Sequence, residues 1–282
     1  MKAYLQALVA GEKNPLRARC LIREYLQARL LEAFQSAGAF RPWAFQGGTA
    51  LRFLFAVPRF SEDLDFALAQ AGLDDGFEAT MQRAQSNLAA ENYAPRLKLQ
   101  TGKIVKSAWF SFDGLPFELG LSPQRTESLS IKVELDTRPP AGAVLATTLV
   151  RRHITLRLQH HDQASLLAGK LHTVLARPYT KGRDLYDLAW YLSAPAWPAP
   201  NLTLLNNALA QTRWRGAVAT EKNWRALVRR RLARVDWKVA VQDVLPFLER
   251  TDEAQWLARA PMLQLLAAPT PHSLAPTNPR RK

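Results

Sequence analysis

The chain has 282 residues, 48% of them hydrophobic, which is enough for one large domain or two ordinary ones with a full core. Its 38 Lys and Arg residues against 24 Asp and Glu give a net charge of +14, which favours a polyanionic partner such as nucleic acid. Alternatively, the excess of Arg reflects a GC-rich genome, whose proteins often have basic surfaces. The single cysteine, Cys20, excludes an intramolecular disulfide and a zinc site built on several thiolates, and with no 18-residue apolar span we expect a cytoplasmic protein without a membrane helix.

The first quarter of the chain predicts alternating helices and strands. Apolar residues near a 3.6-residue period, with Pro15 at a permitted helix start, predict a helix over 15–37. Strand and helix patterns then alternate over the segments 42–46, 49–55, 63–68 and 75–90. The helix over 49–55 ends before Val57-Pro58, because the residue before a proline avoids the helical region.

The middle of the chain predicts antiparallel strands. Apolar and polar residues alternate over 96–138, and Asp113-Gly114 is a hairpin turn signal. In the last of these strands, alternate side chains face opposite ways: Ile131, Val133 and Leu135 on one side, and Lys132, Glu134 and Asp136 on the other. Residues 138–143 break the pattern, and one more strand follows over 153–159.

The rest of the chain predicts helices. Candidate helices span 162–176, 182–193, 201–211, 218–233, 236–249 and 252–267, with Asp162 as the N-cap of the first. Four prolines without apolar periodicity predict a flexible tail over 269–282. We therefore expect an α+β protein with a mixed sheet and flanking helices over 1–160, followed by an all-helical domain over 161–268.

Two aspartates two residues apart are the first chemical signal. On a strand, this spacing puts the carboxylates of Asp63 and Asp65 on one face, where like charges are costly unless a cation lies between them. Carboxylate oxygens suit Mg²⁺ or Mn²⁺, which join them to substrate phosphates. Alternatively, both acids face water at a strand edge.

A glycine pair lies where a strand leads into a helix. Gly47 and Gly48 let the backbone approach an anion, and the helix start after them supplies N–H groups for phosphate, unless the segment is an ordinary turn with Thr49 as N-cap. Glu134 or Asp136 adds a third carboxylate from a later strand. Together these features form the set needed for two-metal nucleotidyl transfer.

The segment "GGTALRFLFAVPRFSEDLDF" resembles the signature of the AbiEii/AbiGii toxin family, and "LLAGKLHTVLARPYTKGRDLYDLAWYL" resembles its later lysine and R-D-x-x-D pattern. The similarity spans about residues 43–192. This family consists of nucleotidyltransferase-like proteins of the DNA polymerase β superfamily that act as toxins in type IV toxin–antitoxin and abortive-infection systems. Some relatives resemble MenT-type tRNA-modifying toxins. The resemblance thus implies a polymerase-β-like fold, a nucleoside triphosphate (NTP) substrate and a cognate antitoxin encoded nearby.

The resemblance also implies roles for single residues. Asp63, Asp65 and Glu134 would be catalytic metal ligands, the family's K-x-E order favouring Glu134 over Asp136. Cofactor-binding positions for the triphosphate would be Gly47, Gly48, Thr49, Arg59 and Lys170, with Lys170 alternatively a catalytic lysine. Ser61 would bind the γ-phosphate or itself be phosphorylated. Of Asp184 and Asp187, one would act as base or as a partner of Lys170 and the other would cap or anchor the helix, and one sequence does not rank them. Without the resemblance, Lys170 would be an ordinary surface lysine.

A second basic region follows in the helical half. Between 211 and 240, nine Lys or Arg residues oppose two acids, with Trp214, Trp224 and Trp237 among them. They either track a phosphate backbone or are solvated arginines beside inward-packed tryptophans.

The sequence therefore predicts a Mg²⁺-dependent nucleotidyltransferase toxin that transfers a nucleoside monophosphate (NMP) from an NTP to an RNA 3′ end, with tRNA as the expected acceptor. The alternatives are protein nucleotidylation, phosphorylation at Ser61, and a catalytically silent RNA-binding module.

Overall fold

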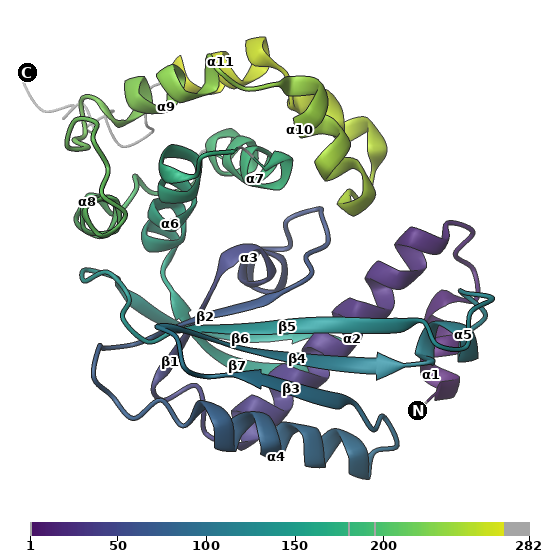
Figure 1. The fold of residues 1–282 in the computed structure, drawn as a ribbon. Coiled ribbons are helices and arrows are strands. Elements are labelled where there is room, and N and C mark those ends of the chain that lie inside the picture. The colour runs from purple at the N-terminus through teal and green to yellow at the C-terminus, as the bar shows by residue number, and fades with distance from the viewer. Residues whose placement is uncertain (1, 180, 195, 268–282) are drawn as a thin grey trace, which may run out of the picture. The chain divides into compact units, whose positions relative to one another are not determined.

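The computed structural model describes residues 2–179, 181–194 and 196–267, so the expected tail over 269–282 lies outside the described residues. The chain divides into two compact units, shown in Figure 1. The first unit comprises Met1–Pro139, Leu145–His161 and Pro246–Thr251, and the second comprises Pro140–Val144, Asp162–Leu245 and Asp252–Lys282. Two short segments, 140–144 and 246–251, thus belong to a different unit from their neighbours in sequence.

A mixed β-sheet forms the centre of the first unit. In the described part of the chain it has seven strands in the order β3-β4-β5-β2-β1-β7-β6. Their bounds are β1 Trp43–Gln46, β2 Leu64–Leu68, β3 Arg96–Gln100, β4 Val105–Asp113, β5 Ser128–Asp136, β6 Leu145–Arg152 and β7 Ile154–His161. The pairs β2–β5 and β1–β7 are parallel and the others antiparallel. The expected mixed sheet is confirmed.

Helices cover the sheet on both sides. They are α1 (Lys2–Val9), α2 (Pro15–Ser36), α3 (Gly47–Phe55), α4 (Phe77–Ala90) and the short α5 (Leu115–Glu118). α2 and α4 lie on one side of the sheet and α3 on the other (Figure 1). Phe34 of α2 packs against Phe66 and Phe110 of the sheet, with ring centroids 6.0 and 6.5 Å apart. The apolar core of this unit therefore lies under α2 and α4.

One strand expectation is wrong, and one strand was missed. The pair Asp113-Gly114 does not close a hairpin, because Gly114, at φ 74°, leads into α5, and β5 resumes only at Ser128. Pro116 suits the first turn of a helix, where a missing N–H costs no hydrogen bond. Strand β6 was not expected at all. It pairs with β7 around His153, which adopts the left-handed conformation with φ 60°.

The second unit is helical. Its helices are α6 (Gln163–Ala176), α7 (Gly182–Ser193), α8 (Leu202–Gln211), α9 (Trp224–Leu232), α10 (Trp237–Val244) and α11 (Arg259–Ala267), with 3₁₀ turns at Leu245–Phe247 and Thr251–Trp256. α6 packs against α7, α8 and α9, and α7 against α10 and α11. Asp162 caps α6 as expected, by accepting a hydrogen bond from the Ser165 N–H at 2.8 Å.

Helix α9 is shorter than the expected 218–233. The side chain of Asn206 on α8 binds both the N–H and the carbonyl of Ala219, at 2.8 and 2.9 Å, so the chain before Trp224 stays in a turn. Among the described residues, no helix is long and apolar enough to cross a membrane.

Candidate active site

The glycine pair forms the junction between β1 and α3. Gly47 has φ 77°, a conformation that side chains with a Cβ rarely adopt. A Cβ at Gly47 would overlap the Oδ2 atom of Asp65, and one at Gly48 would lie 2.6 Å from Nη2 of Arg59 and 3.0 Å from Oγ of Ser61. Gly47 is therefore required by its backbone conformation, a Cβ at Gly48 would displace the Arg59 guanidinium, and three of the expected site residues converge on this turn.

Strand pairing positions Asp65 between the glycine turn and the third acid. In the antiparallel pair β1–β2, Asp65 lies opposite Gln46, the residue just before Gly47. In the parallel pair β2–β5, Asp65 lies beside Glu134, and Ala67 beside Asp136. The sheet therefore brings Glu134 next to Asp65, while Asp136 lies two residues further along the strand.

The main chain at Asp63 is held by buried polar side chains. Thr49, which is fully buried on α3, donates its hydroxyl hydrogen to the carbonyl oxygen of Asp63. Gln27 of α2 donates to the carbonyls of Ser61 and Glu62, at 3.1 and 2.9 Å. Thr49 thus contacts the loop that carries Asp63 rather than capping the helix. Gln27 was not expected, because only the folded chain brings α2 to this loop.

Arg59 is also positioned from outside the motif. It is 2% exposed, and its Nη1 donates to the carbonyl of Phe60 at 2.9 Å. The loop that carries it pairs with a distant part of the chain, since Phe60 N–H donates to Phe247 and Glu249 N–H to Pro58, at 2.7 and 3.1 Å. The segment 246–251 therefore belongs to the scaffold of this site.

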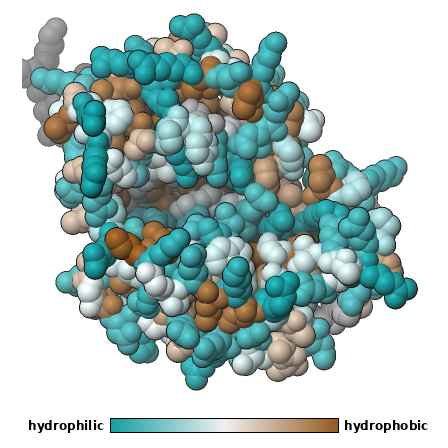
Figure 2. Space-filling view, in the orientation of Figure 1, coloured by the Kyte–Doolittle hydropathy of each residue, from teal (hydrophilic) through white to brown (hydrophobic). Residues whose placement is uncertain are grey.

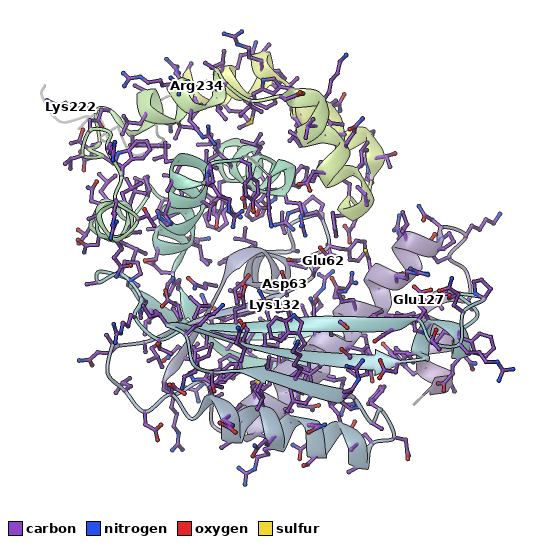
Figure 3. The ribbon with its side chains drawn as sticks, viewed as in Figure 1. Glu62, Asp63, Glu127, Lys132, Lys222 and Arg234 are labelled. Atoms are coloured by element: carbon purple, nitrogen blue, oxygen red, sulfur yellow. The ribbon has the colours of Figure 1, made fainter. Side chains whose placement is uncertain are left out.

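Glu134 has polar partners on its own sheet. Lys132 Nζ lies 2.7 Å from Glu134 Oε1, and Ser107 Oγ lies 3.4 Å from the same oxygen. Asp63 and Lys132 project from the same side of the sheet (Figure 3). Burial raises the pKa of Asp136, which accepts a hydrogen bond from Arg138 N–H at 2.9 Å.

A buried ion pair anchors α3 behind the site. Arg52 of α3 binds Glu24 of α2 at 2.5 Å and donates to the carbonyl of Val57 at 2.9 Å. Arg152 and His153 of the β6–β7 hairpin each lie 3.0 Å from the other oxygen of Glu24. Burial alone would raise the pKa of Glu24, but the His153 hydrogen bond and the two arginines outweigh it and lower this pKa to about 2. Glu24 is therefore ionised at neutral pH and binds Arg52 of α3 as an anion.

The expected residues of the helical half form a second cluster, in the second unit. Lys170 Nζ lies 2.7 Å from Asp184 Oδ1 and 2.8 Å from Asp187 Oδ2. Arg177, which was not expected, binds the other oxygen of Asp184 at 2.6 Å. Asp187 is fully buried and Asp184 is 8% exposed. Asp184 thus serves two cations, whereas Asp187 is the deeper partner of Lys170.

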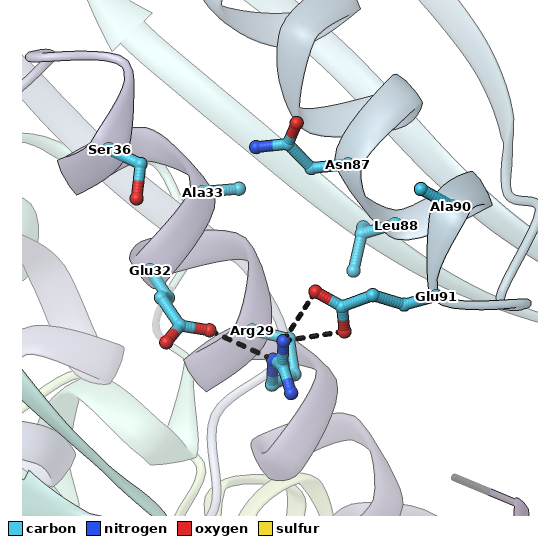
Figure 4. A pocket seen from close by; sticks show the side chains of 8 residues that line it. All are labelled: Arg29, Glu32, Ala33, Ser36, Asn87, Leu88, Ala90 and Glu91. Carbon is cyan, nitrogen blue, oxygen red and sulfur yellow. Dashed lines mark hydrogen bonds and ion pairs between the residues drawn. The ribbon is translucent and has the colours of Figure 1, made fainter.

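A pocket of about 360 Å³ lies between α2 and α4 (Figure 4). These two helices are on the side of the sheet opposite α3 (Figure 1). Arg29 at its wall is bound by Glu91 at 2.5 Å and by Glu32 at 3.1 Å. The pocket is thus separate from the acids of β2 and β5.

A mixed sheet with a glycine turn opposite a D-x-D strand defines the class of protein, a nucleotidyltransferase. The chain belongs to the AbiEii family, described as nucleotidyl transferase toxins of type IV toxin–antitoxin systems, whose family model matches residues 29–260. The sequence matches no curated protein.

Two solved structures share the fold. MenT4, a nucleotidyltransferase toxin of Mycobacterium tuberculosis H37Rv, is 19% identical, with 94% of this chain and 89% of that chain covered and a TM-score of 0.58. A candidate nucleotidyltransferase from H. pylori is 16% identical, with 88% of this chain and 94% of that chain covered and a TM-score of 0.50. The expected family, fold and enzyme class are thus confirmed.

Proposed function

We propose that this toxin transfers an NMP from an NTP to the 3′ hydroxyl of an RNA in the cytoplasm, with tRNA as the acceptor and Mg²⁺ or Mn²⁺ as the ion. One observation carries the proposal. Arg59 and Ser61 approach Gly48 and Asp65 approaches Gly47, and Asp63 precedes Asp65 by two residues in the loop that leads into β2. A phosphate seat and paired carboxylates at one point suit phosphoryl chemistry better than either feature alone.

The donor atoms fit a small hard cation. Mg²⁺ is held in proteins by one or two carboxylates, with water and substrate phosphates filling the other positions. In the described ranges, no three His, Cys, Asp or Glu side chains form a group that could hold a metal ion. Asp63 and Asp65 would therefore hold the ion together with the triphosphate, and Glu134 would act from the neighbouring strand. When bound, the ion neutralises negative charge on the reacting phosphates.

Different residues of the chain would position the triphosphate and the attacking hydroxyl. The N–H groups at the start of α3 and the Arg59 guanidinium would bind the departing pyrophosphate end. An in-line displacement requires the attacking hydroxyl on the opposite side of the reacting phosphorus. Glu134 lies on that side of Asp65, away from the glycine turn, and would accept a hydrogen bond from the hydroxyl. The family resemblance implies that Lys170 binds the triphosphate or acts in catalysis, and that the acids beside it, Asp184 and Asp187, act as base or as partners of Lys170.

An RNA acceptor is supported by the charge of the second unit. Trp224 is buried, and Arg225 and Arg231 donate to carbonyl oxygens of Leu265 and Arg177, so these side chains are structural. The other cations of this region are exposed, namely Arg213, Arg215, Lys222, Arg229, Arg230, Arg234 and Lys238. Apolar side chains form only separate patches on the face shown in Figure 2. A charged surface of this kind suits a phosphate backbone.

The test is transfer of label from each of the four α-labelled NTPs to total RNA. Asp63→Asn and Asp65→Asn keep the side-chain shape and remove the charge, and we expect at least a 100-fold loss of transfer with the fold retained. Asp74→Asn, on an exposed loop of the same unit, is the matched control and should keep full activity. Absence of label from RNA with all four NTPs would overturn the RNA acceptor. Toxicity and RNA binding that survive Asp63→Asn would instead identify a silent binding module. We also expect an antitoxin gene beside the toxin gene.

Ser61 supports a second candidate function, modification of protein. Its hydroxyl lies beside Gly48, which the Arg59 guanidinium also approaches, where the triphosphate would sit. Transfer of the γ-phosphoryl group to Ser61 would release a nucleoside diphosphate, and transfer of NMP would release pyrophosphate. Mass spectrometry of the Ser61 peptide after incubation with NTP distinguishes the two by the added mass. An unmodified peptide excludes Ser61 as the acceptor.

A further inference from the structure

One aromatic side chain interrupts the polar face of the sheet near the acids. Trp109 on β4 lies opposite Lys132 on β5 and opposite Lys98 on β3. The ammonium groups of Lys132 and Lys98 lie 5.5 and 5.8 Å from the centre of the Trp109 ring, within the range of cation–π contact. The three side chains form a row across three strands, which we call the Trp109 row.

The Trp109 row shares a face with the acids. Paired residues on neighbouring strands point to the same side, as do residues two apart on one strand. Asp65 pairs with Glu134, and Glu134 lies two residues after Lys132, so this face continues from β2 across β5 to β4. The alternate residues, such as Phe110, are buried against α2. Trp109 is half-buried and Lys98 is exposed, so Trp109 is not a core residue.

The row lies on the acceptor side of the site. In the sheet, β1 and the glycine turn flank β2 on one side, and β5 and then β4 flank it on the other. With strands about 4.8 Å apart and residues about 3.3 Å apart along a strand, Trp109 lies roughly 12 Å from Asp65. If pyrophosphate leaves toward the glycine turn, the attacking strand arrives from the side of β5 and β4.

We propose that Trp109 is a stacking platform for an unpaired base of the acceptor strand, near its reacting 3′ end, with Lys98 and Lys132 binding the adjoining phosphates. The proposal rests on the function proposed above. Single-stranded nucleic acids are bound in this way, by aromatic rings that accept base stacking and by cations that follow the backbone. Lys98 is exposed, so its contact with the ring is weak. A base can take its place on the ring while the ammonium group moves to a phosphate.

The test compares two RNA hairpins, one with a four-nucleotide single-stranded 3′ end and one with a blunt end, without NTP or divalent cation. For Trp109→Leu we expect Kd for the overhang hairpin to rise roughly 5- to 100-fold, the range for one stacked base, with Kd for the blunt hairpin unchanged. Trp109→Phe keeps a ring and should lose less. Trp256→Leu, which removes a 52% exposed tryptophan of the second unit, is the matched control and should change neither value.

Two outcomes would overturn the platform: an unchanged Kd for the overhang hairpin, or an equal loss of affinity for both hairpins. If Trp109→Leu does not fold, fluorescence decides the matter. Binding of the overhang should quench the wild type more than Trp109→Phe, and equal quenching would contradict stacking. Because no catalysis is required, the result is separable from the proposed function. The hairpin contrast can appear in a protein that transfers no NMP, and transfer can occur without the contrast.

Discussion

Gly47→Ala tests whether a glycine is needed at this turn so that the Asp65 carboxylate can lie close to the backbone. Gly47 adopts φ 77°, and an alanine there costs about 1–2 kcal/mol of folding free energy for the left-handed conformation alone. The new Cβ would also overlap Asp65 Oδ2, so the carboxylate must move. A displacement of about 1 Å in a catalytic group costs on the order of 100-fold in rate. We therefore expect a small loss of stability and a large loss of activity.

Gly72→Ala is the matched control. Gly72 has φ 84°, yet a Cβ there would meet nothing within 4 Å. The two variants should lose about the same free energy of unfolding in urea from backbone strain, but only Gly47→Ala should lose NMP transfer, by about 100-fold. Full activity in Gly47→Ala, or an equal loss in Gly72→Ala, would refute the argument that the glycine is needed for close approach of the carboxylate.

Two of the three further predictions concern residues that support the site, and the third concerns the basic surface of α9. Thr49→Val leaves a buried carbonyl without its donor, so we expect a loss of about 1–3 kcal/mol in urea unfolding and slower transfer, with Thr49→Ser restoring both. Glu24 has its pKa lowered from 4.5 to about 2, so it contributes about 3 kcal/mol that is present above pH 5 and lost as the pH falls toward 2. The wild type should lose more stability over that interval than Glu24→Gln. Replacing both Arg229 and Arg230 by Gln should weaken RNA binding and lower its salt dependence by up to about two counterions.

Each of these has a clear contrary result. Thr49→Ser behaving like Thr49→Val would show that the hydroxyl is not what matters. Parallel acid profiles for the wild type and Glu24→Gln would remove Glu24 from the account of acid stability. Arg83→Gln removes an exposed arginine from α4 and serves as the control for the basic helices. If it weakens RNA binding as much as the change on α9, the effect reflects net charge rather than a surface.

Local patterns predicted the elements of the fold well where the cause was local. The helix from Pro15 follows from its apolar period and from the proline at its start, and Asn14 caps it. The alternation around Val133 predicted both the strand and its buried face. The turn at Asp113-Gly114 was misread because a two-residue signal does not reveal that Pro116 begins a helical turn.

The site residues also divide into those that the local sequence predicted and those that only tertiary contacts reveal. Glycines at a strand–helix junction indicated a close approach, but only the β1–β2 register identifies Asp65 as the approaching group. Gln27 and Arg177 have no motif, because their roles arise from contacts with other parts of the fold. Trp109 followed the period of a strand, and the period alone does not indicate which face carries the acids. These residues became visible only through tertiary pairing.

The most direct test of the proposed function follows the two ends of the NTP. Wild-type protein is incubated with purified tRNA and either α-labelled or γ-labelled NTP, and the tRNA is used both intact and with its 3′ end oxidised by periodate. We predict that only the α label enters RNA, only with an intact 3′ hydroxyl, and that Asp63→Asn abolishes the transfer. Label from the γ-phosphate on the protein, or α label on the oxidised tRNA, would contradict nucleotidyl transfer to an RNA 3′ end.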